Sequence, residues 1–299
     1  MKRIFLTGAT GQIGWELART LMAMGQIVIP ARDRYDLAHP ESLRALVDAV
    51  RPDVIVNAGA YTAVDKAEEE PERALAINAA APAELAIVAR HHNALLVHYS
   101  TDYVFDGRKP GPYDEDDAAC PVSAYGQSKL GGEEVVRASG ADFIIFRTSW
   151  VYAARGNNFL KTILRLAGER EELRIVADQI GAPTWARLIA DVTALALQQD
   201  LALRSIGRFE SGIFNLTASG ETSWHGFATA IVNGARERGA NLKCRTITPI
   251  TTAEYPLPAA RPTNSRLSGA RLAARYGLDM PGWERCLHYC MAELFSQLP

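Results

Sequence analysis

The sequence predicts an α/β fold: a doubly wound parallel sheet with a smaller C-terminal α/β lobe. Two observations in the first half support this class: short apolar runs alternate with longer helical stretches, and a glycine-rich turn directly follows the first run. A third is that the rhythm loosens after about residue 150, where prolines punctuate the loops at 181–184 and 255–262. The chain therefore reads as a sheet-forming first half and a different second half.

The strands and helices of the first half follow from their periodicity. Five compact apolar runs are typical of parallel strands covered on both faces: Lys2–Thr7, Ile27–Pro30, Asp53–Asn57, Ala94–Ser100 and Asp142–Arg147. The stretches between them have helical periodicity: Gln12–Met24, Pro40–Val50, Pro71–His92 and Ser123–Ser139. Because ligands of such sheets bind beyond the carboxyl ends of the strands, the functional residues should directly follow the strands.

The second half predicts a discontinuous lobe. Helical segments are expected near 156–170, 186–200, 222–238 and 281–297. We expect residues 1–150 to form a dinucleotide-binding domain, and residues 151–299 to form mostly a substrate-binding lobe. Part of 186–216 should return to the sheet.

Composition excludes several classes of function. The 32 basic and 34 acidic residues are interspersed and give a net charge of −2, so a nucleic-acid footprint is not expected. The apolar run after Arg3 is too short for a signal peptide, and no stretch reaches the length of a membrane span. Four cysteines without metal-binding spacing fit a reducing compartment. These features predict a cytoplasmic protein without membrane or nucleic-acid partners.

The turn after the first strand predicts a dinucleotide site of the Rossmann type. Its glycines, Gly8, Gly11 and Gly14, have the spacing Gly-x-x-Gly-x-x-Gly between the first strand and the first helix. The first permits the tight turn, the second lets the backbone approach a pyrophosphate, and the third lets helix and strand pack closely. Gln12 and Ile13 then open the helix whose amide groups hold the anion.

The residues after the second strand favour NADPH. An NAD site usually has a carboxylate there for the ribose hydroxyl, whereas this chain has Arg32 and Arg34, which suit a 2′-phosphate. Asp33 between them leaves NADH possible, and both arginines could instead be solvated surface charges. Further cofactor contacts are expected at the adenine and along the loop after the third strand, although small residues there could also be plain packing: Asp36, Leu37, Ala60, Tyr61 and Thr62.

The fourth strand and the following helix predict a site of proton transfer. The strand ends in Tyr99, Ser100 and Thr101, where a nicotinamide should lie. Tyr125 and Lys129 are four residues apart and share one helix face. An ammonium beside a phenol lowers its pKa toward neutrality, so Tyr125 could act as a general acid, with Thr101 bonding the same substrate oxygen. Tyr99, Tyr125 and Lys129 are also expected cofactor contacts.

These motifs resemble the extended short-chain dehydrogenase/reductase superfamily in order and spacing. Finer motifs between residues 11 and 267 resemble the dTDP-4-dehydrorhamnose reductase family within it, among them "GQIGWEL", "HYSTDYVFDG", "YGQSKLGGE", "RTSWVY", "DQIGAPT" and "RPTNSRL". The resemblance implies reduction of the 4-keto group of dTDP-6-deoxy-L-lyxo-4-hexulose (dTDP-4-dehydro-L-rhamnose) to dTDP-L-rhamnose, the last step of dTDP-rhamnose biosynthesis.

The resemblance also implies residue roles. The nicotinamide delivers hydride to carbon 4 and Tyr125 gives a proton to the resulting oxygen. Lys129 lowers the Tyr125 pKa and binds the nicotinamide ribose, while Thr101 orients the carbonyl. Substrate contacts are implied for Thr101, Asp102 and Trp150, the last offering an apolar face to the sugar or else being a core residue. Weaker candidates complete the set: Tyr103, Asn157, Arg261 and Arg266.

One feature departs from the family. Some members dimerise around a divalent cation held by carboxylates, one of which Glu16 matches. The other should follow "GAPT", where this chain has Arg187, which cannot ligate Mg²⁺. We therefore expect no metal at that position, Glu16 on a helix surface, and a monomer or weak homodimer.

Two alternatives to a reductase remain open. One is a nucleotide-sugar epimerase or dehydratase of the same superfamily, although an epimerase would favour an acidic residue after the second strand and a dehydratase a glutamate at Tyr103. The other is a non-catalytic, cofactor-sensing subunit on the same fold. A sensor would not need both Tyr125 and Lys129.

Overall fold

A six-stranded parallel sheet forms the centre of the protein, whose computed structural model describes residues 1–296 and only the backbone of Arg32. Its strand order is β10-β5-β4-β3-β1-β2, with every neighbouring pair parallel. The strands are β1 (Lys2–Thr7), β2 (Gly25–Val28), β3 (Val54–Asn57), β4 (Leu95–Thr101), β5 (Phe143–Thr148) and β10 (Gly212–Asn215). The predicted doubly wound α/β fold is confirmed.

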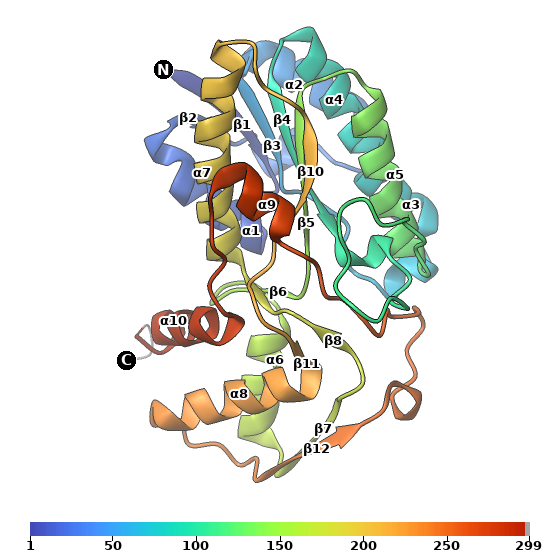
Figure 1. Ribbon diagram of the computed structural model, residues 1–299, viewed down its shortest axis with the longest axis vertical. Helices are drawn as coiled ribbons and strands as arrows, with labels where there is room; N and C mark the ends of the chain where they lie inside the picture. The colour runs from blue at the N-terminus through green and yellow to red at the C-terminus, as the bar shows by residue number, and fades with distance from the viewer. Residues whose placement is uncertain (297–299) are drawn as a thin grey trace.

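Helices cover both faces of this sheet (Figure 1). One face packs against α1 (Gln12–Thr20), α7 (Ala186–Ser205) and α9 (Ala270–Tyr276). The other packs against α2 (Glu41–Val50), α4 (Ala81–His91) and α5 (Ala124–Ala138). Side chains alternate accordingly, since Ile4 and Leu6 of β1 enter the first core and Phe5 enters the second. Both faces of the strands are therefore buried, as their apolar runs predict.

The single helix predicted over Pro71–His92 is interrupted. It consists of α3 (Pro71–Leu75), a π-helical turn η4 (Ala76–Ala80) and α4. Asn78 lies in the π turn and is buried, with its amide donating hydrogen bonds to the Tyr61 carbonyl and the Ser128 hydroxyl. The wider turn thus accompanies a polar side chain aimed into the protein rather than toward solvent.

The C-terminal lobe has its own core between α6 (Phe159–Glu169), α8 (Trp224–Glu237) and α10 (Trp283–Ser296), which lie below the sheet in Figure 1. Three two-stranded pairs complete it: β7 (Glu172–Val176) with β12 (Thr246–Ile250), β8 (Ile180–Gly181) with β11 (Thr222–Ser223), and β6 (Val151–Tyr152) with β9 (Thr184–Trp185). Between these segments, α7, β10 and α9 return to the layers of the large sheet. The return of α9 was not anticipated.

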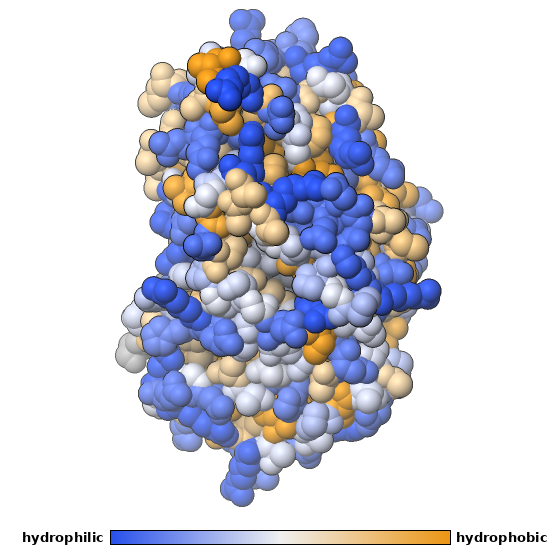
Figure 2. Space-filling view, in the orientation of Figure 1, coloured by the Kyte–Doolittle hydropathy of each residue, from blue (hydrophilic) through white to orange (hydrophobic). Residues whose placement is uncertain are grey.

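Short 3₁₀ turns occupy several connections: η1 (Leu21–Ala23), η2 (Arg32–Arg34), η3 (Lys66–Glu68), η5 (Asp102–Val104) and η6 (Thr252–Glu254). Figure 2 shows hydrophilic side chains over most of one face of the molecule, with hydrophobic ones in scattered patches. Within residues 1–296, no helix combines the length and the apolar character needed to cross a bilayer.

A buried ion pair joins β5 to α5. Arg147 donates two hydrogen bonds to the Glu133 carboxylate, from Nε at 2.9 Å and from Nη2 at 2.6 Å, and the two side chains are 4% and 1% exposed. Arg147 also donates to the Glu115 carbonyl at 3.2 Å, and its guanidinium lies 5.0 Å from the centre of the Phe105 ring. A bidentate pair of this kind fixes both the position and the rotation of α5.

Replacing Glu133 with glutamine should therefore destabilise the protein. Glu133→Gln leaves the buried Arg147 charge without its partner, and we expect the free energy of unfolding to fall by about 3–5 kcal/mol. Glu169→Gln is the matched control, because the Arg165–Glu169 pair is 60% and 53% exposed and should contribute less than about 1 kcal/mol. Urea unfolding of the two variants makes the comparison, and equal losses would contradict the role given to the buried pair.

Candidate active site

Polar side chains join the carboxyl ends of β1 and β3 to the middle of β4. Thr7 donates a hydrogen bond to Asn57 at 2.7 Å, and the Asn57 amide nitrogen lies 3.1 Å from Nδ1 of His98. All three side chains are buried, and burial together with the Lys129 charge holds the pKa of His98 well below its usual value. A neutral imidazole can accept the amide proton of Asn57, so this edge of the sheet is rigid and uncharged.

The glycine turn has the geometry of an anion cradle. Gly8 has a φ of +71°, and a Cβ atom there would lie 2.3 Å from the Gly59 nitrogen. A Cβ at Gly14 would lie 2.1 Å from the Gly8 carbonyl oxygen, whereas one at Gly11 would meet only that oxygen at 3.3 Å. Gly11 precedes α1, whose first turn has no acidic residue. The amide groups at the start of α1 can therefore receive a phosphate group.

Other predicted cofactor residues surround this turn. The Leu37 side chain reaches Gly59, where it would lie 2.5 Å from an added Cβ, and Asp36 is exposed beside it. Asn78 accepts a hydrogen bond from the Tyr61 amide at 2.9 Å, which holds the loop that also exposes Ala60 and Thr62. The cofactor-facing position of these residues stays a prediction.

Tyr35 and Asn78 are absent from the sequence-based set. The Gly8 amide donates to the Tyr35 hydroxyl at 3.4 Å, so this side chain lies against the glycine turn. Arg32 and Arg34 were predicted to suit the 2′-phosphate of NADPH. Arg34 is exposed, and the Arg32 side chain lies outside the described part of the chain.

Thr101, Tyr125 and Lys129 converge at the end of β4. Thr101 is the last residue of that strand, and α5 begins after the Ser123 N-cap, whose hydroxyl accepts from the Gly126 amide. Burial raises the pKa of Tyr125, and the neighbouring Thr101 hydroxyl opposes this effect without cancelling it. The Tyr103 ring packs edge-on against the Tyr125 ring, with centres 5.4 Å apart. The fold therefore places Tyr125 beside Thr101 and the Lys129 ammonium against the Tyr99 carbonyl of the same strand, and the shared catalytic role of the three residues stays a prediction.

The pKa of Tyr125 differs from the expectation. Lys129 is 2% exposed and donates a 2.5 Å hydrogen bond to the Tyr99 carbonyl, while burial lowers its pKa to about 8 against the opposing effect of Glu133. Burial raises the pKa of Tyr125 above its usual value, and Lys129 does not offset it. The expected lowering of the Tyr125 pKa by Lys129 is thus wrong for this structure, because desolvation dominates and the ammonium faces a carbonyl.

The rings of Tyr99 and Trp150, which were predicted to contact the cofactor and the sugar, pack against other parts of the protein. The Tyr99 ring lies in the core against α7, where its hydroxyl is 2.8 Å from that of Thr193, so Tyr99 offers the site only its backbone. Trp150 has a φ of +48° and stacks on Trp224, with ring centres 3.6 Å apart. Gly181 also approaches this ring, since a Cβ there would lie 2.7 Å from Cε2. The face of Trp150 that meets Trp224 is not free for a sugar.

The polar substrate candidates are mostly engaged within the protein. Arg261 binds Asp65 with both terminal nitrogens, at 2.8 and 2.7 Å. Arg266 pairs with Glu221 at 3.0 Å. Asn157 is exposed, while its neighbour Asn158 donates to Gln12 at 2.8 Å and caps α6. The cap pattern of an Asn before an apolar helix could have identified Asn158 from the sequence.

Glu16 does not lie on a helix surface, so that expectation is wrong. Its side chain is 3% exposed and accepts hydrogen bonds from Arg187 at 3.1 and 3.3 Å and from Arg19 at 3.1 Å. Arg187 also pairs with Glu293 of α10 at 2.9 Å. The carboxylate is buried because a guanidinium compensates its charge.

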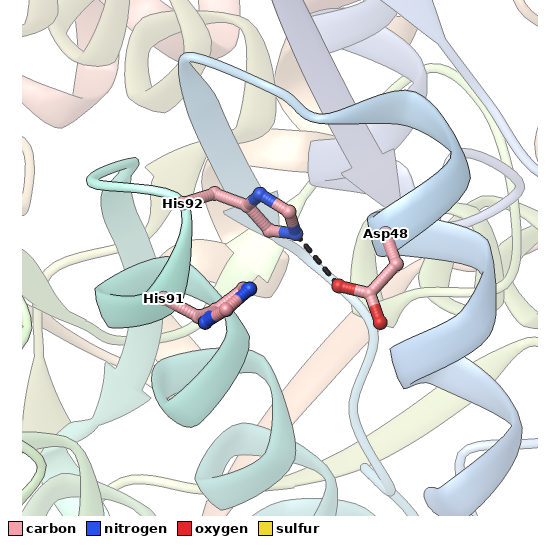
Figure 3. A group of neighbouring side chains, drawn as sticks. All are labelled: Asp48, His91 and His92. Carbon is pink, nitrogen blue, oxygen red and sulfur yellow. Dashed lines mark hydrogen bonds and ion pairs between the residues drawn. The ribbon is translucent and has the colours of Figure 1, made fainter.

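The other end of the sheet, opposite the glycine turn, holds one group of residues that could together bind a metal ion. Within residues 1–296 this is the one such group, and it consists of Asp48, His91 and His92 (Figure 3). His92 and Asp48 already form a 2.6 Å contact. A hollow of about 660 Å³ at this end is lined by basic residues, among them Arg51 and Arg204. Because α2, α4 and α7 end here, basic side chains oppose the negative ends of three helices. The charge of the helix ends therefore explains the basic residues, and the hollow lies far from Tyr125.

Comparison with known proteins identifies the family. Residues 1–296 match the family described as the RmlD substrate binding domain. The chain belongs to this family. A member from Burkholderia thailandensis, named dTDP-4-dehydrorhamnose reductase, is 53% identical over 297 residues, which cover 99% of this chain and 100% of that relative.

Solved structures of the RmlD family agree with this fold. The dTDP-4-dehydrorhamnose reductase of Bacillus anthracis, solved in complex with NADP, has a TM-score of 0.87 and 35% identity and covers 98% of this chain and 99% of its own. A UDP-glucose 4-epimerase of Thermus thermophilus, solved with NAD, has a TM-score of 0.80 at 19% identity over 99% of this chain and 100% of its own. The second likeness supports the fold alone. The resemblance found in the sequence motifs is confirmed.

The glycine turn gives a test that separates packing from ligand approach. Gly14→Ala should lower the melting temperature, because its Cβ would lie 2.1 Å from the Gly8 carbonyl oxygen. Gly11→Ala should leave the melting temperature nearly unchanged and weaken NADPH binding, because its side chain would extend toward the phosphate position. Thermal unfolding and fluorescence titration measure both effects. Equal destabilisation by the two substitutions would contradict this division.

Proposed function

We propose that this chain catalyses the NADPH-dependent reduction of the 4-keto group of dTDP-4-dehydro-L-rhamnose to dTDP-L-rhamnose. The observation that carries the proposal is the convergence of Thr101, Tyr125 and Lys129 at the end of β4, in a sheet whose first strand leads into a phosphate-binding glycine turn. The name of the 53% identical relative supports the substrate. The chain is then an oxidoreductase of nucleotide-sugar metabolism.

Tyr125 would donate the proton to the oxygen on carbon 4. Burial raises the pKa of its phenol, so the side chain carries its proton at neutral pH, which is the form that a proton donor needs. Lys129, with a pKa of about 8, is mostly charged at neutral pH and lies one helical turn further along α5. Its ammonium would bind the ribose of the nicotinamide. Thr101 would hold the carbonyl oxygen.

NADPH supplies the hydride when it is bound. The residues proposed to hold it are those of the glycine turn and its neighbours: Gly8, Gly11, Gln12, Ile13, Gly14, Arg32, Asp36, Leu37, Ala60, Tyr61, Thr62 and the Tyr99 carbonyl. The NADP complex of the Bacillus anthracis relative supports the choice of NADPH, and Arg32 is proposed to bind the 2′-phosphate.

The proposed substrate residues are Thr101, Asp102 and Trp150. Thr101 and Asp102 lie at the strand end, and Trp150 follows β5 at the point where the chain enters the C-terminal lobe. Trp150 would meet the sugar with the part of its ring that Trp224 leaves free. We further propose a cytoplasmic location and a monomer or weak homodimer.

Consumption of NADPH with the dTDP-linked 4-keto sugar tests the proposed function. Wild type should oxidise NADPH upon addition of the substrate, and Tyr125→Phe should lower kcat about 10²–10⁴-fold while NADPH still binds, because only the proton donor is lost. Tyr289→Phe is the matched control, since this tyrosine is 51% exposed on α10. The same assay with NADH measures the cofactor preference. NADPH binding without any turnover by wild type would favour the cofactor-sensing alternative.

We also propose that no Mg²⁺ ion takes part at Glu16. Arg187 already neutralises this carboxylate, so a cation would have to displace a guanidinium that makes two hydrogen bonds to it. Excess EDTA should leave the rate, the melting temperature and the sedimentation coefficient unchanged, and added MgCl₂ should restore nothing. A magnesium-dependent rate together with a magnesium-linked dimer would overturn the proposal.

A further inference from the structure

Asp102 is a buried acid for which the proposed reaction has no proton-transfer role. It directly follows Thr101, its side chain is 3% exposed, and its Oδ1 accepts a hydrogen bond from the Thr101 hydroxyl at 2.9 Å. Its other oxygen, Oδ2, is buried and has no hydrogen-bond partner among the described residues. Burial of this carboxylate is therefore only partly compensated, by Thr101, Ser265 and the backbone amides of Asp102 and Tyr103, and such burial is costly for an ionised group.

The charged groups around Asp102 do not compensate it. Arg261 of the loop before α9 is held by Asp65 in a bidentate pair, and Lys129 of α5 donates to the Tyr99 carbonyl. The remaining titratable neighbours, Tyr103 and Tyr125, are neutral phenols whose pKa values are raised by burial. Burial accordingly raises the pKa of Asp102 to about 6.

Ser265 is the contact of Asp102 from the C-terminal lobe. It is 3% exposed, and its hydroxyl lowers the pKa of the carboxyl, as that of Thr101 also does, although both effects are smaller than that of burial. It therefore favours the ionised acid while touching neither Thr101 nor Tyr125 through a hydrogen bond of the described structure.

The hydroxyl of Thr101 has a single proton, and Asp102 competes for it. Thr101 Oγ1 accepts from the Tyr103 amide at 3.2 Å and donates to Asp102. While Asp102 is ionised, its carboxylate engages the only proton of Thr101, which is then not free for a second acceptor. Once Asp102 is protonated, the acid can donate to Oγ1 instead, and the Thr101 proton is released.

We propose that Asp102 is a positioning residue whose protonation sets the direction of the Thr101 hydroxyl: the ionised acid holds its proton, and the neutral acid frees it for the substrate carbonyl. This inference rests on the proposed reduction. Asp102 keeps its own proton through the reaction, because Tyr125 supplies the proton and the nicotinamide the hydride. The neutral form of Asp102 is thus the active form of the free enzyme.

The pH dependence of kcat/KM tests this role, because it reports groups of the free enzyme. For wild type, kcat/KM should fall about tenfold per pH unit once the pH exceeds the Asp102 pKa near 6. We call this decrease of kcat/KM with rising pH the alkaline limb. In Asp102→Asn the amide donates to Thr101 at every pH, so this limb should vanish. In Ser265→Ala the acid loses a group that favours its ionised form, so the limb should move to higher pH. Ser205→Ala, at the end of α7, is the control and should leave the limb in place.

A second measurement does not depend on turnover. NMR of the free enzyme labelled with ¹³C in the aspartate carboxyls should show one resonance that titrates near pH 6, is missing in Asp102→Asn and moves upward in Ser265→Ala. Burial also raises the pKa of Asp200, so the assignment depends on the variant: a wild-type spectrum without a resonance that titrates near pH 6 and is missing in Asp102→Asn would overturn the inference.

The outcomes separate this inference from the proposed function. Turnover by wild type with the same limb in Asp102→Asn overturns the positioning role alone. Lack of turnover by wild type at every pH contradicts the proposed function, and the inference falls with it. A limb that disappears in Asp102→Asn and shifts in Ser265→Ala supports both.

Discussion

The buried Arg147–Glu133 ion pair is the constraint on which the other features depend. It holds α5 against β5, and α5 carries both Tyr125 and Lys129. The same arginine binds the Glu115 carbonyl, and the Glu115 carboxylate accepts from the Asn215 amide at 2.8 Å, so β10 is fixed to the same point. Glu133 also raises the pKa of Lys129 against desolvation. One interaction therefore helps to place both catalytic candidates, and its carboxylate partly offsets the effect of burial on Lys129.

The close approach of α5 to its neighbours adds to this constraint. A Cβ at Gly126 would lie 2.2 Å from the Tyr103 carbonyl, and one at Gly132 would lie 2.1 Å from the Asn78 carbonyl. Small residues thus let the helix meet the turn after β4 on one side and the π turn on the other. The π turn in turn holds the Tyr61 loop through Asn78. The glycine content of "YGQSKLGGE" reflects this packing.

Sequence reasoning predicted the sheet because it rests on local patterns, and the same patterns led to the proposed site residues. The apolar runs specify β1, β3, β4 and β5, whereas β2 lies at Gly25–Val28, two residues before the predicted Ile27–Pro30. The i to i+4 spacing of Tyr125 and Lys129 needs only a helix. What it missed depends on residues distant in the chain. Arg187 reaches Glu16 from α7, Ser265 reaches Asp102 from a loop before α9, and Trp224 covers a face of Trp150. The pKa of Tyr125 was misjudged because burial is a property of the assembled fold.

The return of α9 to the large sheet has a consequence for the order of assembly. Leu272 and Tyr276 of α9 belong to the core beneath β10, where Tyr276 packs on Phe214 at 5.2 Å between ring centres. During synthesis, the first layer therefore stays incomplete until nearly the whole chain has left the ribosome. A growing chain that ends before α9 exposes apolar surface of its largest core. Exposed apolar surface of this kind favours aggregation, so we expect the nascent chain to need protection until α9 has emerged.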